Sequence, residues 1–201
     1  MKYKFSLLLG LSIVVATAQG QNFEGRLSYE NYSVIDSDTV ESSSMNYWIK
    51  DHLYKHKGVY KKNPLLDLGT LYANAAEMTR SNLLNAKVER IKMSPNPILP
   101  DLLLESTEQS SPVLGYSCKV YHLTDGNGKL LSKLWVTEEI SNDSFDEFVE
   151  LFEYNNTLFP ITGIKGWILK REDYRREGKI FVSEAKEVKS SELQLAEMLI
   201  Y

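Results

Sequence analysis

Cysteine is nearly absent from this chain of 201 residues, since Cys118 is the only one. A single cysteine cannot form an internal disulfide, and Cys118 lies too far along the chain to carry the lipid anchor of a lipoprotein. It alternates with Tyr116 and Val120 in a strand-like run, so we expect a small buried core residue and not a nucleophile. The composition thus excludes a disulfide scaffold and argues against a lipid anchor.

Histidine is also scarce, with three residues. His52 and His56 are four positions apart, but the stretch around them reads as strand and offers no acidic third ligand. We therefore interpret them as a solvated pair and not as a metal site. His122 has no serine or aspartate motif that would indicate a catalytic triad. We predict no metal, no cofactor and no enzymatic activity.

An excess of basic charge and a membrane-spanning apolar run are both missing. The chain has 23 Lys and Arg against 27 Asp and Glu, which disfavours a nucleic-acid partner. Its longest apolar run, residues 5–15, follows Lys2 and Lys4 and precedes the small residues 16–18. This is the pattern of a secretory signal peptide. We predict a signal peptide over 1–18, a single domain over 19–201, and a soluble periplasmic or secreted protein that is not an integral membrane protein.

The chain does contain strand-forming sequence, most clearly between residues 115 and 139. Two runs rich in Val, Tyr, Trp and Thr flank the turn cluster Asp125-Gly126-Asn127-Gly128. Asp-Gly and Asn-Gly pairs supply the positive φ angles of tight hairpin turns. We predict a β-hairpin here and expect it at the centre of a sheet.

Further strands are predicted where apolar and polar residues alternate or where strand-forming residues cluster. They cover 23–32, 45–49, 52–56, 65–72, 86–93, 163–173 and 179–188. The Asp/Ser-rich segment 33–44 and the Pro-rich segment 94–112 are predicted to be connections, since proline disfavours a central strand. Residues 73–80 fit a helical turn as well as a strand.

One clear helix is predicted over 141–154, because apolar residues recur there at helical spacing, namely Phe145, Phe148, Val149 and Phe152. A short closing helix is predicted over 191–199. The expected fold class is mainly β (α+β): a single strongly curved antiparallel sheet or half-open barrel, with one or two helices against the concave face.

The hairpin also carries a family resemblance. The pattern Gly115-Tyr116-x-Cys118-Lys119-x-Tyr121, followed by the run 134–139, LWVTEE, resembles the signature region of the domain-of-unknown-function 4412 family of secreted or periplasmic bacterial domains. An early F-x-G-x-L strand at 23–27 extends the likeness. That family has no established activity. The resemblance implies an architecture similar to the LolA/LppX-like lipoprotein carriers, a curved antiparallel sheet with helical lids.

The leading functional hypothesis is a non-enzymatic extracytoplasmic binding module that holds a lipid or another apolar small molecule in the concavity of its sheet. The residues expected to contact the ligand are aromatic: Trp48, Tyr116, Trp135, Phe145, Phe148, Phe152 and Trp167. The alternative is a structural or interaction domain whose concavity is filled by its own side chains. A hydrolase is the third hypothesis.

One modification site is also predicted. Asp38-Thr39-Val40 resembles the short Asp-Ser/Thr-apolar signal for O-glycosylation in secreted proteins of Bacteroidetes, and it lies in a polar segment. Three N-x-Ser/Thr triplets, at Asn31, Asn142 and Asn155, are common by chance and carry little weight.

Export should remove residues 1–18, because the small residues 16–18 complete the signal-peptide pattern. N-terminal sequencing of the mature protein should give a chain that starts at Gln19. A mature chain that begins at Met1, or that partitions with detergent-extracted membrane proteins, would contradict the prediction.

Overall fold

The computed structural model describes residues 23–62, 67–74, 76–77, 79–84, 87–92, 102–140, 148–151, 157–160, 166–176 and 178–199. The predicted signal peptide, Phe145 and Phe152 lie outside these residues. None of the helices in the described part is long and apolar enough to cross a membrane.

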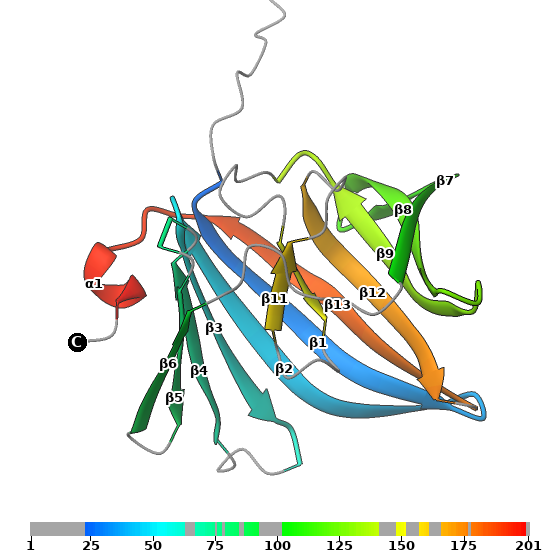
Figure 1. The fold of residues 1–201 in the computed structure, drawn as a ribbon, viewed down its shortest axis with the longest axis horizontal. Helices are drawn as coiled ribbons and strands as arrows, with labels where there is room; N and C mark the ends of the chain where they lie inside the picture. Colours follow the sequence, from blue (N-terminus) through cyan, green and yellow to red (C-terminus); the bar gives the residue numbers. More distant parts are fainter. Residues whose placement is uncertain are drawn as a thin grey trace, which may run out of the picture.

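Eleven antiparallel strands form one curved, open sheet, which confirms the predicted fold class (Figure 1). Their order is β6-β5-β4-β3-β2-β1-β13-β12-β9-β8-β7, so the first strand pairs with the last. The strands are β1 (Gly25–Ile35), β2 (Asp38–Lys50), β3 (Leu53–Tyr60), β4 (Asp67–Asn74), β5 (Thr79–Leu84), β6 (Lys87–Lys92), β7 (Leu102–Val113), β8 (Tyr116–Asp125), β9 (Leu130–Thr137), β12 (Trp167–Arg176) and β13 (Lys179–Ser190).

Strand β1 shows why the sheet has one inner and one outer face. Its odd-numbered residues from Gly25 to Ser33 are all buried, and its even-numbered residues are half-buried. Side chains of a strand alternate between faces, and residues paired across strands share a face. The register Leu27↔Tyr47 therefore carries the buried face of β1 across to β2.

The predicted hairpin is confirmed as β8 and β9. The Asp125 carboxylate accepts hydrogen bonds from the backbone N–H groups of Asn127 and Lys129, at 2.9 Å each, and Gly128 has φ +78°. The expected central position is wrong, because β8 is the second strand from one edge of the sheet. The central strand is β1, which pairs along its whole length with β2 and β13.

The segment 33–44 is not the predicted connection. Only Asp36 and Ser37 form a turn, with φ angles of 47° and 74°, and the residues on either side belong to β1 and β2. The serines are compatible with a strand here because their hydroxyls find partners in β1. Ser42 donates to the carbonyl of Asn31, and Ser43 accepts from its side chain.

The prediction of a connection over the Pro-rich segment 94–112 is wrong from residue 102 onward, since Leu102–Val113 form β7, and residues 94–101 lie outside the described residues. Pro112 is tolerated because β7 is an edge strand and one of its sides has no neighbour in the sheet. A register shift between Ser106 and Ser110 marks a bulge in the same strand. Within 73–80, which we also considered as a helical turn, strand β4 ends at Asn74 and strand β5 begins at Thr79.

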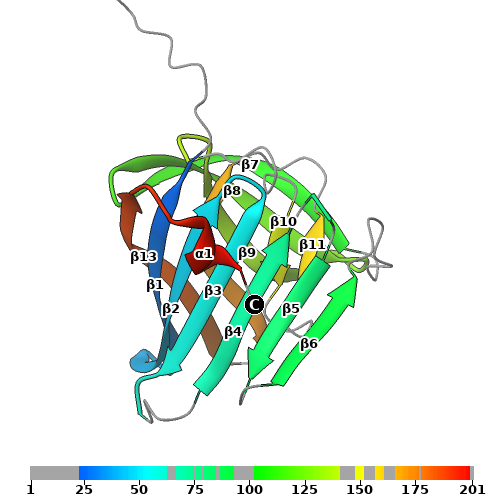
Figure 2. The ribbon, with the colours of Figure 1, turned by 90° about the vertical axis from the view of Figure 1, so that its left-hand side faces the viewer.

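The predicted helix over 141–154 is wrong for the residues that the structure describes. Phe148–Leu151 form strand β10, which pairs with β11 (Thr157–Pro160) in a separate two-stranded sheet. Phe and Val favour strands intrinsically, so pairing with β11 overrides the helical spacing. Figures 1 and 2 show β10 and β11 on the inner side of the large sheet.

The predicted closing helix exists as the single turn α1 (Leu195–Met198). It packs on the outer face of the sheet, where Leu193 and Met198 form a buried cluster with Leu53 and the half-buried Trp48. Lys55 Nζ donates to the carbonyl of Glu197 at 2.9 Å. Figure 2 shows α1 in front of β2 and β3, so this helix does not lie against the concave face as predicted.

Cys118 is fully buried, as predicted, and burial raises the pKa of its thiol. We expect thiol reagents to label the folded protein slowly, because little thiolate forms and access is blocked. Cys118→Ala should cost about 1 kcal/mol in the free energy of unfolding and leave ligand binding unchanged. Rapid labelling by a chromogenic disulfide reagent without denaturant would contradict this.

Gly166 allows β12 to approach the end of β9. Its φ is +103°, and a Cβ at this position would lie 2.1 Å from the carbonyl oxygen of Thr137. Gly166→Ala should therefore destabilise the protein by about 3–5 kcal/mol in urea unfolding. Gly128→Ala is the matched control: its φ of +78° strains a side chain, but no atom lies within 4 Å, so it should cost only about 1–2 kcal/mol. Equal costs would contradict the steric argument.

Candidate binding surface on the concave face

The concave face carries an aromatic cluster built from β1, β2, β3 and the start of β12. Its members are Tyr29, Tyr47, Tyr54, His56 and Trp167. The Tyr29 and Tyr47 rings meet edge to face, with centroids 4.9 Å apart, and the Trp167 ring lies 6.4 Å from Tyr47 and 6.1 Å from Tyr54. Such geometries are favourable for aromatic pairs.

Hydrogen bonds fix the polar tips of these rings. Trp167 Nε1 donates to the Tyr29 hydroxyl at 2.8 Å, and that hydroxyl donates to the carbonyl of Ile168 at 2.7 Å. Tyr54 and His56 meet at 3.4 Å between the hydroxyl and Nδ1. The rings are therefore held in place before any ligand arrives.

The three tyrosines of the aromatic cluster belong to a larger hydrophobic core. The partly buried apolar side chains that pack against this core are Phe23, Tyr116, Trp135, Trp167 and Val188. Most lie toward one end of the sheet, where β1 and β12 begin and β13 ends, as the pairs Gly25↔Ser190 and Trp167↔Thr137 show. We call this end the aromatic rim.

The structure brings two of the three predicted tryptophans, Trp135 and Trp167, against the same core. Trp167 belongs to the aromatic cluster, and Tyr116 lies at the rim. Trp135 pairs with Lys170, whose Nζ lies 4.6 Å from its ring centroid, and Trp48 lies on the outer face beneath α1. Of the predicted Phe residues, only Phe148 is described, as the first residue of β10, and no side-chain position is described for it.

Sequence reasoning missed Tyr29, Tyr47, Tyr54 and His56 as members of the site. The signal was available for the tyrosines, because Leu27, Tyr29 and Asn31 alternate in one strand and Met45, Tyr47 and Ile49 in another. The prediction of a solvated His56 is wrong: it is 5% exposed, since its register partner is the inner-facing Tyr47.

Further along the same face, the aromatic side chains give way to polar ones. We call the group Asn31, Ser43, Ser132, Arg171, Asp173 and Ser183 the polar band. Arg171 donates to both carboxylate oxygens of Asp173, at 2.9 and 2.5 Å, and Ser132 donates to the same carboxylate. The pairs Asn31↔Ser43, Asn31↔Ser183 and Arg171↔Ser183 link the strands of the band.

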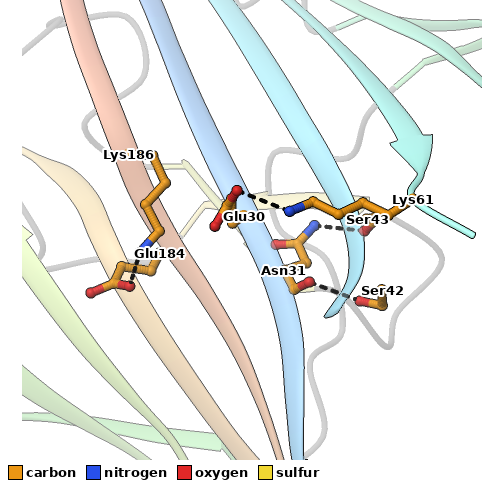
Figure 3. Close-up of polar contacts among 7 residues, drawn as sticks. All are labelled: Glu30, Asn31, Ser42, Ser43, Lys61, Glu184 and Lys186. Carbon is orange, nitrogen blue, oxygen red and sulfur yellow. Dashed lines mark hydrogen bonds and ion pairs between the residues drawn. The ribbon is translucent and has the colours of Figure 1, made fainter. Parts of the chain in front are cut away.

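The outer face of the same strands is charged. Figure 3 shows Lys61 paired with Glu30 at 2.9 Å and Lys186 with Glu184 at 2.5 Å, while Asn31 is joined to Ser42 and Ser43. Asn31 is 1% exposed, so its N-x-Ser triplet is not accessible in the folded protein. Thr39, in contrast, is exposed beside the β1–β2 turn.

No metal centre is formed by the described residues, since they contain no group of three His, Cys, Asp or Glu side chains that could hold an ion. The buried Asp173 carboxylate is engaged by Arg171 and Ser132. What the concave face offers chemically is an apolar, aromatic surface that adjoins a hydrogen-bonding one.

No protein-family model matches the chain, and no curated protein matches it. Among solved structures, PNGF-II is similar in two crystal forms, each with a TM-score of 0.52 and 16% identity. The match covers 85% of this chain but only 28% or 29% of PNGF-II. The chain thus spans less than a third of that protein, and the likeness is one of fold.

Two smaller proteins match over most of both chains. One is described as an outer membrane lipoprotein-sorting protein domain from Vibrio parahaemolyticus, with a TM-score of 0.44, 8% identity and 90% of each chain covered. The other is a LolA superfamily protein from Nitrosomonas europaea, with a TM-score of 0.39, 10% identity, and 90% of this chain and 92% of that chain covered. At these TM-scores the likeness carries no argument, and the resemblance to the domain-of-unknown-function 4412 family stays a prediction.

Proposed function

We propose that the protein is a non-enzymatic extracytoplasmic binding module, exported by its signal peptide, that holds a lipid or another apolar molecule against the concave face of its single domain. The observation that carries this proposal is the aromatic cluster, whose buried rings continue into the partly buried Trp167 at the rim. The sequence resemblance to the domain-of-unknown-function 4412 family, which implies a LolA-like carrier architecture, supports the same function.

The energetics of the surface favour an apolar ligand. Each Å² of apolar surface removed from water stabilises a complex by about 25 cal/mol before the costs of association are subtracted. The hydrogen bonds of Tyr29 and Trp167 fix their rings in advance, so little side-chain entropy is lost on binding. Trp167 is the member of the cluster best placed to meet a ligand, because it is only half-buried.

A second candidate is a structural or interaction domain without a ligand. The observation in its favour is that Tyr29, Tyr47 and Tyr54 are each at most 9% exposed, so the protein's own side chains fill that part of the concave face. A hydrolase remains the third hypothesis and would need a reactive group beyond the Asp173 carboxylate, which Arg171 and Ser132 already engage.

Thr39 is proposed as an O-glycosylation site, because it is exposed beside a turn and carries the Asp-Thr-Val pattern. The intact mass of protein purified from its natural host should exceed the mass calculated for residues 19–201, and Thr39→Ala should abolish the difference.

Ligand binding should be reported by Trp167 and not by Trp48. Two variants isolate these signals: Trp48→Phe with Trp135→Phe leaves Trp167 alone, and Trp135→Phe with Trp167→Phe leaves Trp48. Added laurate should shift or quench the emission of the first variant, because Trp167 adjoins the concave face, and should leave the second unchanged, because Trp48 lies beneath α1.

Mass spectrometry of organic extracts of the natively purified protein provides the second measurement. Bound lipid together with a Trp167 response supports the proposal. No co-purifying apolar molecule and no Trp167 response would retire it and leave the structural candidate.

A further inference from the structure

The polar band is unusual for the inner face of a curved sheet. Buried inward positions normally carry apolar residues, yet β1, β2, β9 and β12 each place a buried polar side chain in this band. The band begins one inward position beyond the aromatic cluster, because Asn31 follows Tyr29 on the same face of β1. The concave face is therefore amphipathic along the strand direction.

Asn31 is the residue of the band whose hydrogen bonding is incomplete. Its side-chain Nδ2 donates to Ser43 Oγ at 3.0 Å, while its Oδ1 atom is buried and has no partner among the residues that the structure describes (Figure 3). Buried amide oxygens in native proteins nearly always accept a hydrogen bond, and leaving one unpaired destabilises the folded state. The free protein thus retains an acceptor that a donor from outside the chain could satisfy.

The charges of the band indicate what kind of donor fits. Arg171 and Asp173 form a bidentate pair and contribute no net charge together. A carboxylate head group would bring a charge into this buried region and would offer Asn31 Oδ1 no donor. A hydroxyl brings a donor without a charge, so its desolvation costs less.

We infer that the ligand is an amphiphile with a neutral, hydroxyl-bearing head, and that the head donates a hydrogen bond to Asn31 Oδ1 while the apolar part extends over the aromatic cluster toward Trp167. This inference rests on the proposed function. Asn31 lies six residue steps along β1 from Gly25 at the rim, which corresponds to about 20 Å at roughly 3.3 Å per step. A single extended acyl chain therefore suits the concave face, because it can run along β1 from Asn31 to the aromatic rim.

The test compares 1-monolauroylglycerol with laurate, which has the same acyl chain and a carboxylate head. Isothermal titration calorimetry of the full mature chain, below the concentrations at which the probes aggregate, should show about tenfold tighter binding of the monoacylglycerol, the gain expected from satisfying one buried acceptor.

Two variants locate the preference. Asn31→Leu combined with Ser43→Ala removes both partners of the internal hydrogen bond, and it should bind the two probes equally well. Its unfolding midpoint should stay near that of the wild type or rise, because an unpaired buried acceptor is lost. Asn46→Leu is the matched control: Asn46 Oδ1 lies on the outer face and already accepts from Arg26 and Ser28, so the tenfold preference should remain.

The outcomes separate this inference from the proposed function. Equal binding of both probes by the wild type, or a preference that survives in the Asn31 variant, overturns the hydroxyl assignment and leaves an apolar binding module. Binding of neither probe overturns both. If the double variant does not fold, the preference of the wild type together with that of Asn31→Ala decides the question in the same way.

Discussion

The pairing of the first strand with the last is the constraint on which the rest of the structure depends. Strands β1 and β13 are joined over eleven residue pairs, and this ladder connects β2 to β6 on one side with β12 and β7 to β9 on the other. Glu24 fastens the same junction, because its carboxylate accepts from Lys50 Nζ at 2.6 Å and from the backbone N–H of Leu193 at 2.5 Å. Both hydrogen bonds lower the pKa of Glu24 below its usual value, and the one from the Leu193 backbone has the larger effect. A sheet whose two halves are joined by strands so distant in sequence is expected to fold slowly.

The strands could be predicted from the sequence where one face of the strand is buried and the other faces solvent. Residues 23–32 and the hairpin at 115–139 show this alternation or a turn with glycine, and both predictions are confirmed. The prediction failed where local preference and long-range pairing disagree. Phe148 and Val149 have helical spacing but pair with β11, and Ser42 and Ser43 resemble a connection but find hydrogen-bond partners in β1. Of the candidate site, the sequence prediction recovered Trp167, Tyr116 and Trp135. It missed the inner tyrosines because alternation shows that they share a face within each strand, while their contact across strands depends on a register that the sequence does not display.

The two edges of the sheet are protected in different ways. Strand β6 exposes Lys87, Glu89 and Arg90, whose charges oppose pairing with another chain. Strand β7 combines the bulge between Ser106 and Ser110 with Pro112, which cannot donate to a ladder. The open, curved sheet thus keeps two edge strands without offering them for aggregation.

The pairing Gly25↔Ser190 also brings the start of the first strand and the end of the last strand to the same place. A domain whose first and last strands end side by side is suited to insertion into a loop of another protein, because the two ends of that loop need not move far apart. The ends of these two strands could equally be joined to each other and the chain reopened at the tight Asp36-Ser37 turn, which belongs to neither the aromatic cluster nor α1. Such a rearrangement would keep the concave face, because the order of the strands in the sheet does not depend on where the polypeptide starts.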